Sequence, residues 1–262
     1  MAAHTDKPLN GKIALITGGS RGLGRSMAEH VADRGAGVII TYRSDAAAAE
    51  AVVASIRGRG GAAVALPLDA TDLGSFGAFA EAVHGQLDTT FSRSTFDFLV
   101  NNGGFGHHAP LLETTPEAFD ALMGVHVRGP LFLIQALAPL LEDGGRLVNI
   151  STGLTRIVLP GYGAYAAMKA ALETMSVYLA AELGGRRIRV NTLAPGAIAT
   201  DFSGGVVRDN ADVNAMIASA TALGRVGLPD DIGGALSTLL APESGWINAQ
   251  RIEASGGQAI SA

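Results

Sequence analysis

Short apolar runs rich in β-branched residues alternate with helical segments along the whole chain, and this alternation constrains the fold most. Strands are expected over residues 12–17, 38–42, 62–68, 96–100, 145–151, 187–194 and 250–254. Helices are expected up to residue 34, over 45–59, 73–86, 115–141 and 163–184, and from residue 229. Runs that are apolar at successive positions are typical of parallel strands buried on both faces. The pattern predicts one doubly wound α/β domain over residues 1–262, with about seven parallel strands and helices on both faces.

Composition excludes several classes of protein. Charged residues make up 16% of the 262 residues and the net charge is −5, which argues against a nucleic-acid partner. The chain has no cysteine, and its start, MAAHTDKPLNGK, lacks the apolar core of a signal segment. We therefore expect a soluble, cytoplasmic protein with neither a membrane nor a nucleic acid as partner.

The first predicted strand leads into a glycine-rich turn and then into a helix. The turn reads Gly18-Gly19-Ser20-Arg21-Gly22-Leu23-Gly24. Glycine lets backbone approach a phosphate closely, and a helix N-terminus offers free N–H groups with a partial positive charge. This arrangement is typical of the dinucleotide cradle of a Rossmann-type fold, but its spacing is not G-x-G-x-x-G, and a purely structural turn is the alternative.

The second predicted strand ends at Tyr42, followed by Arg43 and Ser44. In doubly wound folds this strand end approaches the adenosine ribose, where an acidic residue binds the 2′-hydroxyl of NAD. Here the guanidinium groups of Arg21 and Arg43 suit a 2′-phosphate, because arginine binds phosphate through a rigid fork of donors. Solvated surface arginines are the alternative. The pattern favours NADP(H) as the cofactor.

Two later strand ends carry further candidate contacts. Asp69 follows the third strand, where it either accepts a hydrogen bond from an adenine amino group or caps the next helix. The fourth strand leads into Asn101-Asn102-Gly103-Gly104. The glycines there either let backbone lie close to a ligand or form an ordinary turn.

Tyr165 and Lys169 lie four residues apart in a segment expected to be helical, so their side chains share one face. A fixed cation beside a phenol favours the phenolate and lowers the tyrosine pKa from its usual value of about 10. Such a pair can act as a general acid or base near neutral pH. A tyrosine packed on a lysine stem is the common alternative, so the pair alone does not establish chemistry.

The histidines do not suggest a metal site. His126 lies inside the predicted helix 115–141, where a structural role is more common than a catalytic one. His107 and His108 are expected at a loop surface. No pair of histidines has the spacing of metal ligands, so we expect no metal.

Five motifs occur in an order that resembles the short-chain dehydrogenase/reductase family. They are TGGSRGLG at 17–24, NNGG at 101–104, NIST at 149–152, YAAMK at 165–169 and PGAIAT at 195–200. The resemblance covers almost the whole chain and includes bacterial NADPH-dependent carbonyl reductases such as 3-oxoacyl-carrier-protein reductases. It implies reversible hydride transfer from NADPH to a ketone or aldehyde, giving an alcohol.

The resemblance also implies a role for each matching residue. Tyr165 would donate a proton to the carbonyl oxygen, assisted by Lys169 and by the hydroxyl of Thr152. Together with Arg43 and Ser44, the predicted cofactor contacts are Gly18, Ser20, Arg21, Gly22, Leu23, Gly24, Asp69, Ala70, Asn102, Gly103, Tyr165, Lys169, Pro195, Gly196, Ile198 and Thr200. Family likeness further suggests a homotetramer built on the helices at 116–141 and 163–184.

Three residues depart from the family pattern. Gly103 stands where alanine is usual, which we expect to loosen the turn, and Thr152 replaces the usual serine. His126 stands where many members have an asparagine that helps to hold a water near the lysine in a proton relay. A neutral imidazole still donates or accepts one hydrogen bond, whereas a charged one would oppose Lys169.

The residues expected around the substrate are mainly apolar, which suits a hydrophobic or aromatic ketone better than a polyanion. They are Phe105, His107, Gly153, Leu154, Ile157, Pro160, Tyr162 and the segment 197–216. Residues 197–221 lack sustained periodicity and are expected to form a mobile substrate lid. The alternative function is an NADP(H)-binding sensor or interaction protein with weakened catalysis. The intact Tyr165 and Lys169 pair favours the enzyme, whereas His126 and Thr152 keep the alternative open.

We predict that catalysis survives the change at position 126 through an altered relay, in which the imidazole of His126 takes part. The pH–rate profile of a His126→Asn variant should then differ from that of the parent enzyme. A variant profile that matches the parent in both rate and shape would exclude a relay role for His126.

Overall fold

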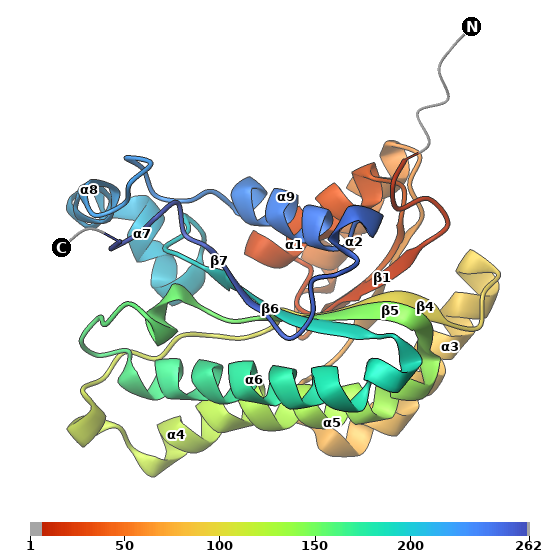
Figure 1. The fold of residues 1–262 in the computed structure, drawn as a ribbon, viewed down its shortest axis with the longest axis horizontal. Helices are drawn as coiled ribbons and strands as arrows, with labels where there is room; N and C mark the ends of the chain where they lie inside the picture. The colour runs from red at the N-terminus through yellow and green to blue at the C-terminus, as the bar shows by residue number, and fades with distance from the viewer. Residues whose placement is uncertain (1–6, 261–262) are drawn as a thin grey trace, which may run out of the picture.

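The computed structural model describes residues 7–260, and a parallel sheet of seven strands runs through this part of the chain (Figure 1). Its order is β3-β2-β1-β4-β5-β6-β7. The strands are β1 Ile13–Ile16, β2 Gly37–Tyr42, β3 Ala63–Pro67, β4 Phe96–Asn101, β5 Leu141–Ile150, β6 Arg189–Pro195 and β7 Arg251–Ala254. The predicted single doubly wound α/β domain is confirmed. The first six residues, part of the start judged to lack a signal segment, lie outside the described residues.

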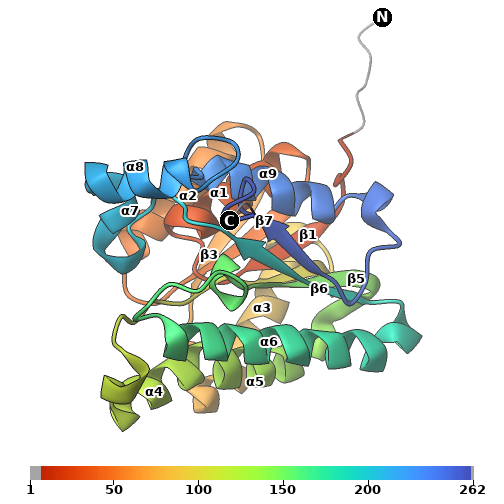
Figure 2. The ribbon, with the colours of Figure 1, turned by 60° about the vertical axis from the view of Figure 1, so that its left-hand side comes forward.

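Helices cover both faces of the sheet (Figures 1 and 2). One layer holds α1 (Gly22–Asp33), α2 (Ala46–Gly58) and α9 (Pro229–Leu239). The other holds α3 (Phe76–Phe91), α5 (Gly129–Leu137) and α6 (Gly163–Glu182), with α4 (Pro116–Met123) leading into α5. The strands therefore lie between two helical layers, as their uninterrupted apolar sequences require.

Strand β1 shows how the sequence builds both cores. Successive side chains of a strand point to opposite faces, so Ala14 and Ile16 join the core that includes Met27 of α1. Ile13 and Leu15 join the opposite core. All four β1 side chains are buried, with at most 3% of their surface exposed. The strand is thus apolar at every position because it has no solvent face.

The strand order reverses between β1 and β4, and the ligand crevice of a doubly wound sheet lies at such a reversal, beyond the carboxyl ends of the strands. The chain leaves β1 through the glycine turn and leaves β4 through Asn102 and Gly103. The Thr17 hydroxyl oxygen accepts from both backbone amides, at 2.9 Å from Asn102 and 3.0 Å from Gly103. This side chain ties the two strand ends together at the crevice.

Helix α3 is longer than predicted. It continues to Phe91, whereas the sequence predicted an end near Gln86 and a polar loop over 88–95. The phenyl ring of Phe91 packs where Gly37 leaves space, since a β-carbon on Gly37 would lie 2.5 Å from that ring. The polar residues after Gln86 occupy the exposed side of the last turn, and Ser92 ends the helix in the left-handed conformation. The polar residues of this stretch predicted a loop because the contact of Phe91 with Gly37, which belongs to β2, has no local sequence pattern.

The helix predicted over 115–141 is interrupted, and its end was placed too late. A π-helical turn, Gly124–Arg128, separates α4 from α5, and Leu141 already belongs to β5. Proline lacks an N–H and its ring clashes with the carbonyl four residues earlier, which for Pro130 is the carbonyl of His126. The irregularity therefore lies one turn before the expected bend at Gly129-Pro130. It sets the position of the His126 side chain.

Residues 197–221 contain helices that the sequence did not predict, because their apolar residues show no helical periodicity. Two short helices, α7 (Val206–Asp209) and α8 (Ala211–Ser219), occupy this segment, and neither has a fully buried residue. A helix that buries no face needs no apolar stripe, so no pattern marked it. The two helices stand at one end of the molecule, on the side of the sheet that α1, α2 and α9 cover (Figures 1 and 2). The mobility of this lid stays a prediction.

The helical run Pro116–Leu140 is long enough and apolar enough to cross a membrane by length and composition alone, since an 18-residue window in it has a mean hydropathy of 1.4. In the structure, Leu133, Ile134 and Leu137 of this run are buried against the sheet, as expected of a core helix. Other apolar side chains on α4, α5 and α6 are exposed, namely Phe119, Met123, Phe132, Val177 and Tyr178. The homotetramer predicted on these helices stays a prediction.

Candidate active site

A cavity of ≈ 750 Å³ opens at the carboxyl ends of the strands, and its lining includes every residue predicted as a catalytic or cofactor contact. Those residues are Gly18, Ser20, Arg21, Gly22, Leu23, Gly24, Arg43, Ser44, Asp69, Ala70, Asn102, Gly103, His126, Thr152, Tyr165, Lys169, Pro195, Gly196, Ile198 and Thr200. The fold brings these separate motifs to one place because all parallel strands end at the same edge. Their individual roles stay predictions.

The glycine turn is closely packed against itself. Gly18 has a φ of +65°, a conformation that favours glycine, and a β-carbon on Gly24 would lie 2.1 Å from the carbonyl oxygen of Gly18. The side-chain amide of Asn102 donates to the carbonyl oxygen of Thr17 at 2.9 Å. The close approaches at Gly18 and Gly24 need glycine at both positions, and the turn lines the cavity.

Gly103 is not required by packing. A β-carbon at this position would have its nearest contact 3.6 Å away, at the Thr17 hydroxyl, which is an ordinary van der Waals distance. The alanine usual in the family would therefore fit here. The amide of Gly103 is still held by Thr17, and the predicted loosening of the turn stays a prediction.

Arg21 and Arg43 are both exposed at the rim of the cavity. Within residues 7–260, neither guanidinium forms a hydrogen bond or ion pair with the protein. Most other arginines of the chain do form such pairs, as Arg156 does with Glu253 and Arg225 with Asp231. Two unpaired guanidinium groups at one rim suit an anionic ligand.

The Asp69 carboxylate makes its hydrogen bonds within its own loop. Its Oδ1 accepts from the backbone amide of Thr71 at 2.9 Å and from the Thr71 hydroxyl at 2.7 Å. These two hydrogen bonds, helped by the charge of Arg43, hold the pKa of the Asp69 carboxyl below its ordinary value. Asp69 thus closes a local turn with Thr71 and does not cap a helix, since Asp72 is the N-cap of the next helical turn, Leu73–Ser75. A contact of Asp69 with adenine stays a prediction.

Tyr165 and Lys169 lie on α6, as predicted, with 5% and 4% of their surfaces exposed. The Lys169 ammonium donates to the carbonyl oxygen of Ile150 at 2.7 Å. Its Nζ atom lies 5.9 Å from the centroid of the Tyr165 ring. One helix turn therefore places both functional groups on one face, at the end of β5.

The expected fall in the tyrosine pKa is not found. Burial raises the pKa of Tyr165 well above its ordinary value, and hydrogen bonding with Thr152 offsets this only partly. Burial also lowers the pKa of Lys169 to about 8, against the opposing effect of Glu173. Desolvation dominates both shifts, because it penalises the charged form of each group, the phenolate and the ammonium. The phenol is therefore fully protonated at neutral pH.

Thr152 begins the short 3₁₀ turn Gly153–Thr155 that follows β5. Its hydroxyl oxygen accepts from the Leu154 amide at 3.2 Å, which orients the side chain. The same hydroxyl is within hydrogen-bonding reach of the Tyr165 phenol, which lowers the tyrosine pKa. Threonine thus occupies the place that the family resemblance assigned to it.

His126 is buried, with 1% of its surface exposed, and it is neutral. Burial, followed by the charge of Lys169, lowers its pKa to about 3. Nε2 donates to the carbonyl oxygen of Phe105 at 2.7 Å, which leaves Nδ1 as an acceptor without a partner in the described part of the chain. The ring stands edge-on to Tyr165, with 5.2 Å between centroids. A neutral imidazole does not repel the Lys169 ammonium, unlike the charged form considered from the sequence.

Gly104 makes room for this histidine. A β-carbon at position 104 would lie 2.4 Å from Cε1 of His126, closer than packed atoms approach. The imidazole is larger than an asparagine side chain, and it fits because the residue opposite has no side chain. The sequence motif NNGG contained this glycine, but nothing in it indicated the contact.

Phe202 is a site residue that the sequence analysis did not single out. Its ring lies 5.8 Å from the Tyr165 ring, centroid to centroid, and lines the cavity with Phe105. The next three residues, Ser203 to Gly205, all have positive φ values. The two consecutive glycines in this stretch were the sequence feature that could have indicated the turn.

Only part of the predicted substrate wall lines the cavity. Phe105 and residues 198 and 200–204 line it, whereas His107, Gly153, Leu154, Ile157, Pro160 and Tyr162 do not.

Comparison with known proteins decides the family. The family model described as Enoyl-(Acyl carrier protein) reductase matches residues 18–259. The chain belongs to the short-chain dehydrogenase/reductase family. It is 33% identical over 253 residues to the hydroxynaphthalene reductase arp2 of Aspergillus fumigatus, a match that covers 93% of this chain and 90% of that protein. Family membership confirms the predicted enzyme class, an oxidoreductase.

Solved structures of other short-chain dehydrogenase/reductases share the whole fold. The angucycline C-6 ketoreductase LanV with bound NADP has a TM-score of 0.92 and 34% identity, covering 98% of this chain and 99% of that one. A short chain dehydrogenase from Burkholderia cenocepacia in complex with NADP has a TM-score of 0.86 and 36% identity, covering 95% and 98%. Both are similar to this chain over nearly its full length.

We predict that His126 stays neutral throughout the range in which histidine normally titrates. Its imidazole NMR signals, assigned by their loss in His126→Asn, should not move between about pH 5 and pH 9. A midpoint above pH 5 would contradict this assignment of charge.

The lowered pKa of His126 also makes the stability of the fold depend on pH. The unfolded chain takes up a proton at this histidine near pH 6.5, whereas the folded protein does so only near 3. The free energy of unfolding should therefore fall as the pH decreases through this window and be unaffected by His126 above it. Urea unfolding of the parent and of His126→Asn measures this difference, which should disappear in the variant.

Proposed function

We propose that this enzyme reduces a ketone or aldehyde carbonyl to an alcohol with NADPH, and catalyses the reverse oxidation. The convergence of Tyr165, Lys169 and Thr152 in one cavity is the observation that carries the proposal. A protonated phenol, a buried ammonium and a hydroxyl together form the donor set that a carbonyl oxygen needs as it gains negative charge.

The chain's own residues fit NADP(H). The glycine turn lies at the N-terminus of α1 and lines the cavity, and its glycines place no side chains between the helix N-terminus and a bound phosphate. The unpaired Arg21 and Arg43 suit the 2′-phosphate, and the two similar crystal structures cited above contain NADP. When bound, the reduced nicotinamide supplies the hydride.

Tyr165 is the proposed proton donor. Because burial raises its pKa, the phenol holds its proton until a carbonyl oxygen beside it becomes basic. The carbonyl carbon gains the hydride and the oxygen gains the phenolic proton, which leaves an alcohol and a tyrosinate. The Lys169 ammonium, held by Ile150, stabilises that tyrosinate electrostatically. Thr152 donates its hydroxyl proton in a hydrogen bond to the same substrate oxygen.

His126 is proposed to help return the proton to Tyr165. Its Nδ1 is an unpartnered acceptor in a buried site, and its neutral state next to Lys169 costs no charge repulsion. A water placed between Nδ1 and the ammonium would connect the two groups. This is the altered relay that the pH–rate profile of His126→Asn tests.

The substrate is proposed to be a flat, hydrophobic ketone. Phe105 and Phe202 both line the cavity, and the ring of Phe202 lies beside that of Tyr165. Aromatic faces bind flat rings by offset or edge-on packing. The names of the similar proteins, a hydroxynaphthalene reductase and an angucycline ketoreductase, agree with this choice.

We predict that Tyr165→Phe lowers kcat for reduction of an aromatic ketone by about 100-fold or more, the range for loss of a general acid. The ring is retained, so NADPH binding, followed by nicotinamide fluorescence, should stay within about twofold. The assay is the loss of NADPH absorbance with purified enzyme and a panel of aromatic and aliphatic ketones.

Two outcomes would contradict the proposal. A Tyr165→Phe variant with parental kcat would show that another group supplies the proton. Tight NADPH binding by the parent enzyme without turnover of any ketone would instead support the sensor or interaction protein.

We predict that replacing Arg21 and Arg43 by alanine raises KM for NADPH much more than KM for NADH. Each charge-assisted contact to the 2′-phosphate contributes about 1.5–3 kcal/mol, which is at least about tenfold in affinity. Arg25→Ala is the matched control, because Arg25 is exposed one turn further along α1 and pairs with Glu29 outside the cavity. Equal loss of NADPH and NADH affinity, or a loss in the control as well, would refute the phosphate clamp.

A further inference from the structure

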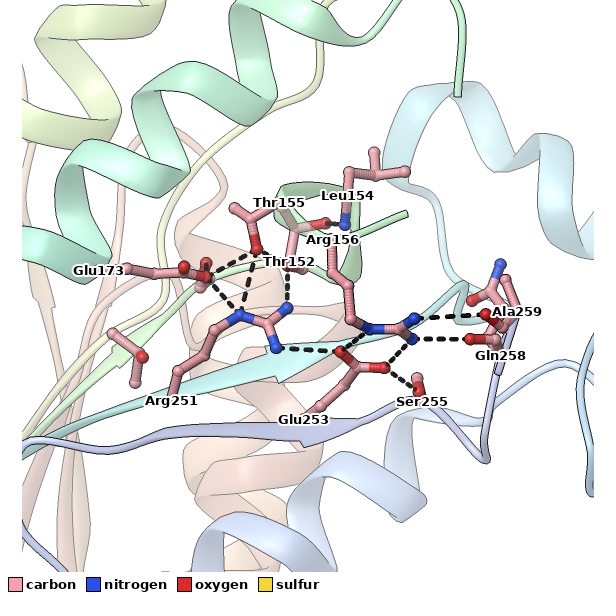
Figure 3. Close-up of polar contacts among 12 residues, drawn as sticks. Thr152, Leu154, Thr155, Arg156, Glu173, Arg251, Glu253, Ser255, Gln258 and Ala259 are labelled. Atoms are coloured by element: carbon pink, nitrogen blue, oxygen red, sulfur yellow. Dashed lines mark hydrogen bonds and ion pairs between the residues drawn. The ribbon is translucent and has the colours of Figure 1, made fainter. Parts of the chain in front are cut away.

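A chain of four alternating charges lies behind the turn that carries Thr152 (Figure 3). Glu173 comes from α6, Arg251 and Glu253 from β7, and Arg156 from the turn after β5. The side chains of the first three are mostly buried, with 17%, 25% and 19% of their surfaces exposed. The four charges cancel, so this network is a neutral connection between three elements of the site.

Arg251 is the member of this network that reaches the site. Its Nε donates to the Glu173 carboxylate at 2.8 Å and to the Thr155 hydroxyl at 3.1 Å. One terminal nitrogen donates to the backbone carbonyl of Thr152 at 3.1 Å, and the other donates to Glu253 at 3.0 Å (Figure 3). A single planar guanidinium thus holds the backbone of the proposed hydroxyl donor and a carboxylate on the catalytic helix.

Glu173 connects the same network to Lys169. It lies one turn beyond Lys169 and two turns beyond Tyr165 on α6, so the three share a helix face. Its Oε1 accepts from the Ser151 hydroxyl at 2.5 Å and from the Thr155 hydroxyl at 3.0 Å. The negative charge of Glu173 favours the ammonium form of Lys169, in opposition to burial.

We propose that Arg251 is a positioning residue for the reduction, holding the Thr152 turn and the Glu173 carboxylate in one frame against α6. The inference rests on the proposed function, because it assigns Arg251 an effect through Thr152 and Lys169. Arg251 itself does not line the cavity.

Two separate consequences follow from the geometry. Without the guanidinium, the Thr152 carbonyl loses a side-chain donor and the turn is free to shift relative to Tyr165, and shifts of ~1 Å cost up to about 100-fold in rate. Without the positive charge, the carboxylate of Glu173 acts more strongly on Lys169. The first effect requires a planar fork of donors, and the second requires only a positive charge.

The charged and titratable groups that face Lys169 are few. Tyr165 and Glu173 face it from α6, and His126 faces it from the π-helical turn. Arg251 pairs with Glu173 at 2.8 Å. His126 is neutral and Tyr165 keeps its proton, so the charge balance between Glu173 and Arg251 is what a substitution can change.

The test compares Arg251→Gln, Arg251→Lys and Glu173→Gln with the parent enzyme. Steady-state reduction of an aromatic ketone is measured across pH, and NADPH binding is measured by fluorescence. Arg186→Gln is the matched control. Arg186 also pairs with one carboxylate, at 2.7 Å, and caps the backbone carbonyls of Ala138 and Leu141, but it lies at the opposite end of β5.

The expected result separates geometry from charge. Arg251→Gln should lower kcat at least about tenfold with NADPH affinity within about twofold, because the turn moves while the cradle does not. Arg251→Lys should keep the parental pH profile but not the parental kcat, since a point charge cannot replace the fork. The Arg186→Gln control should retain the parental kcat and the parental pH profile.

The pH profiles should shift in opposite directions. Activity needs the Lys169 ammonium, so it is lost as the pH rises through the pKa of about 8. Arg251→Gln raises that pKa and moves the loss to higher pH, whereas Glu173→Gln lowers it and moves the loss to lower pH. A purely structural role for the network would weaken both variants without opposite shifts.

The outcomes that overturn the inference differ from those that overturn the proposed function. Parental kcat in Arg251→Gln, or equal shifts in both variants, with an active parent enzyme, would remove the positioning role alone. A parent enzyme that binds NADPH but reduces no ketone would remove the proposed function, and the inference with it.

Discussion

The buried ammonium of Lys169 is the constraint on which the rest of the site depends. An enclosed charge is costly unless it has polar partners, and here the Ile150 carbonyl and the Glu173 carboxylate supply them. The same enclosure keeps the Tyr165 phenol protonated and the His126 imidazole neutral. The buried cation thus lies beside a protonated phenol and a neutral imidazole, and its own charge helps to keep the imidazole neutral.

Much of the fold follows from short-range rules, which is why it could be predicted from the sequence. Strand β1 is apolar at each position because both of its faces are covered, and Gly18 and Gly24 are glycines because the turn leaves no space for a β-carbon. Tyr165 and Lys169 share a helix face by spacing alone. Parallel strands end at one edge, so motifs distant in sequence had to meet there.

What could not be predicted depends on contacts between distant segments. Phe91 extends α3 because Gly37 leaves space for its ring, and Pro130 places the π-helical turn that carries His126. Arg251 lies 78 positions from Glu173 and 99 from Thr152 in the chain, so neither contact leaves a local pattern. The depressed tyrosine pKa was wrong for the same reason, because the degree of burial is a property of the whole fold.

The contact between Gly104 and His126 constrains the order in which substitutions at these positions could accumulate. A β-carbon at 104 and an imidazole at 126 cannot coexist in this geometry, since they would lie 2.4 Å apart. With glycine at position 104, position 126 can hold either histidine or a smaller residue. With histidine at position 126, position 104 can hold only glycine. A descendant of this protein could therefore replace His126 by a smaller residue in one step. Gly104 could be replaced only after His126 has been replaced.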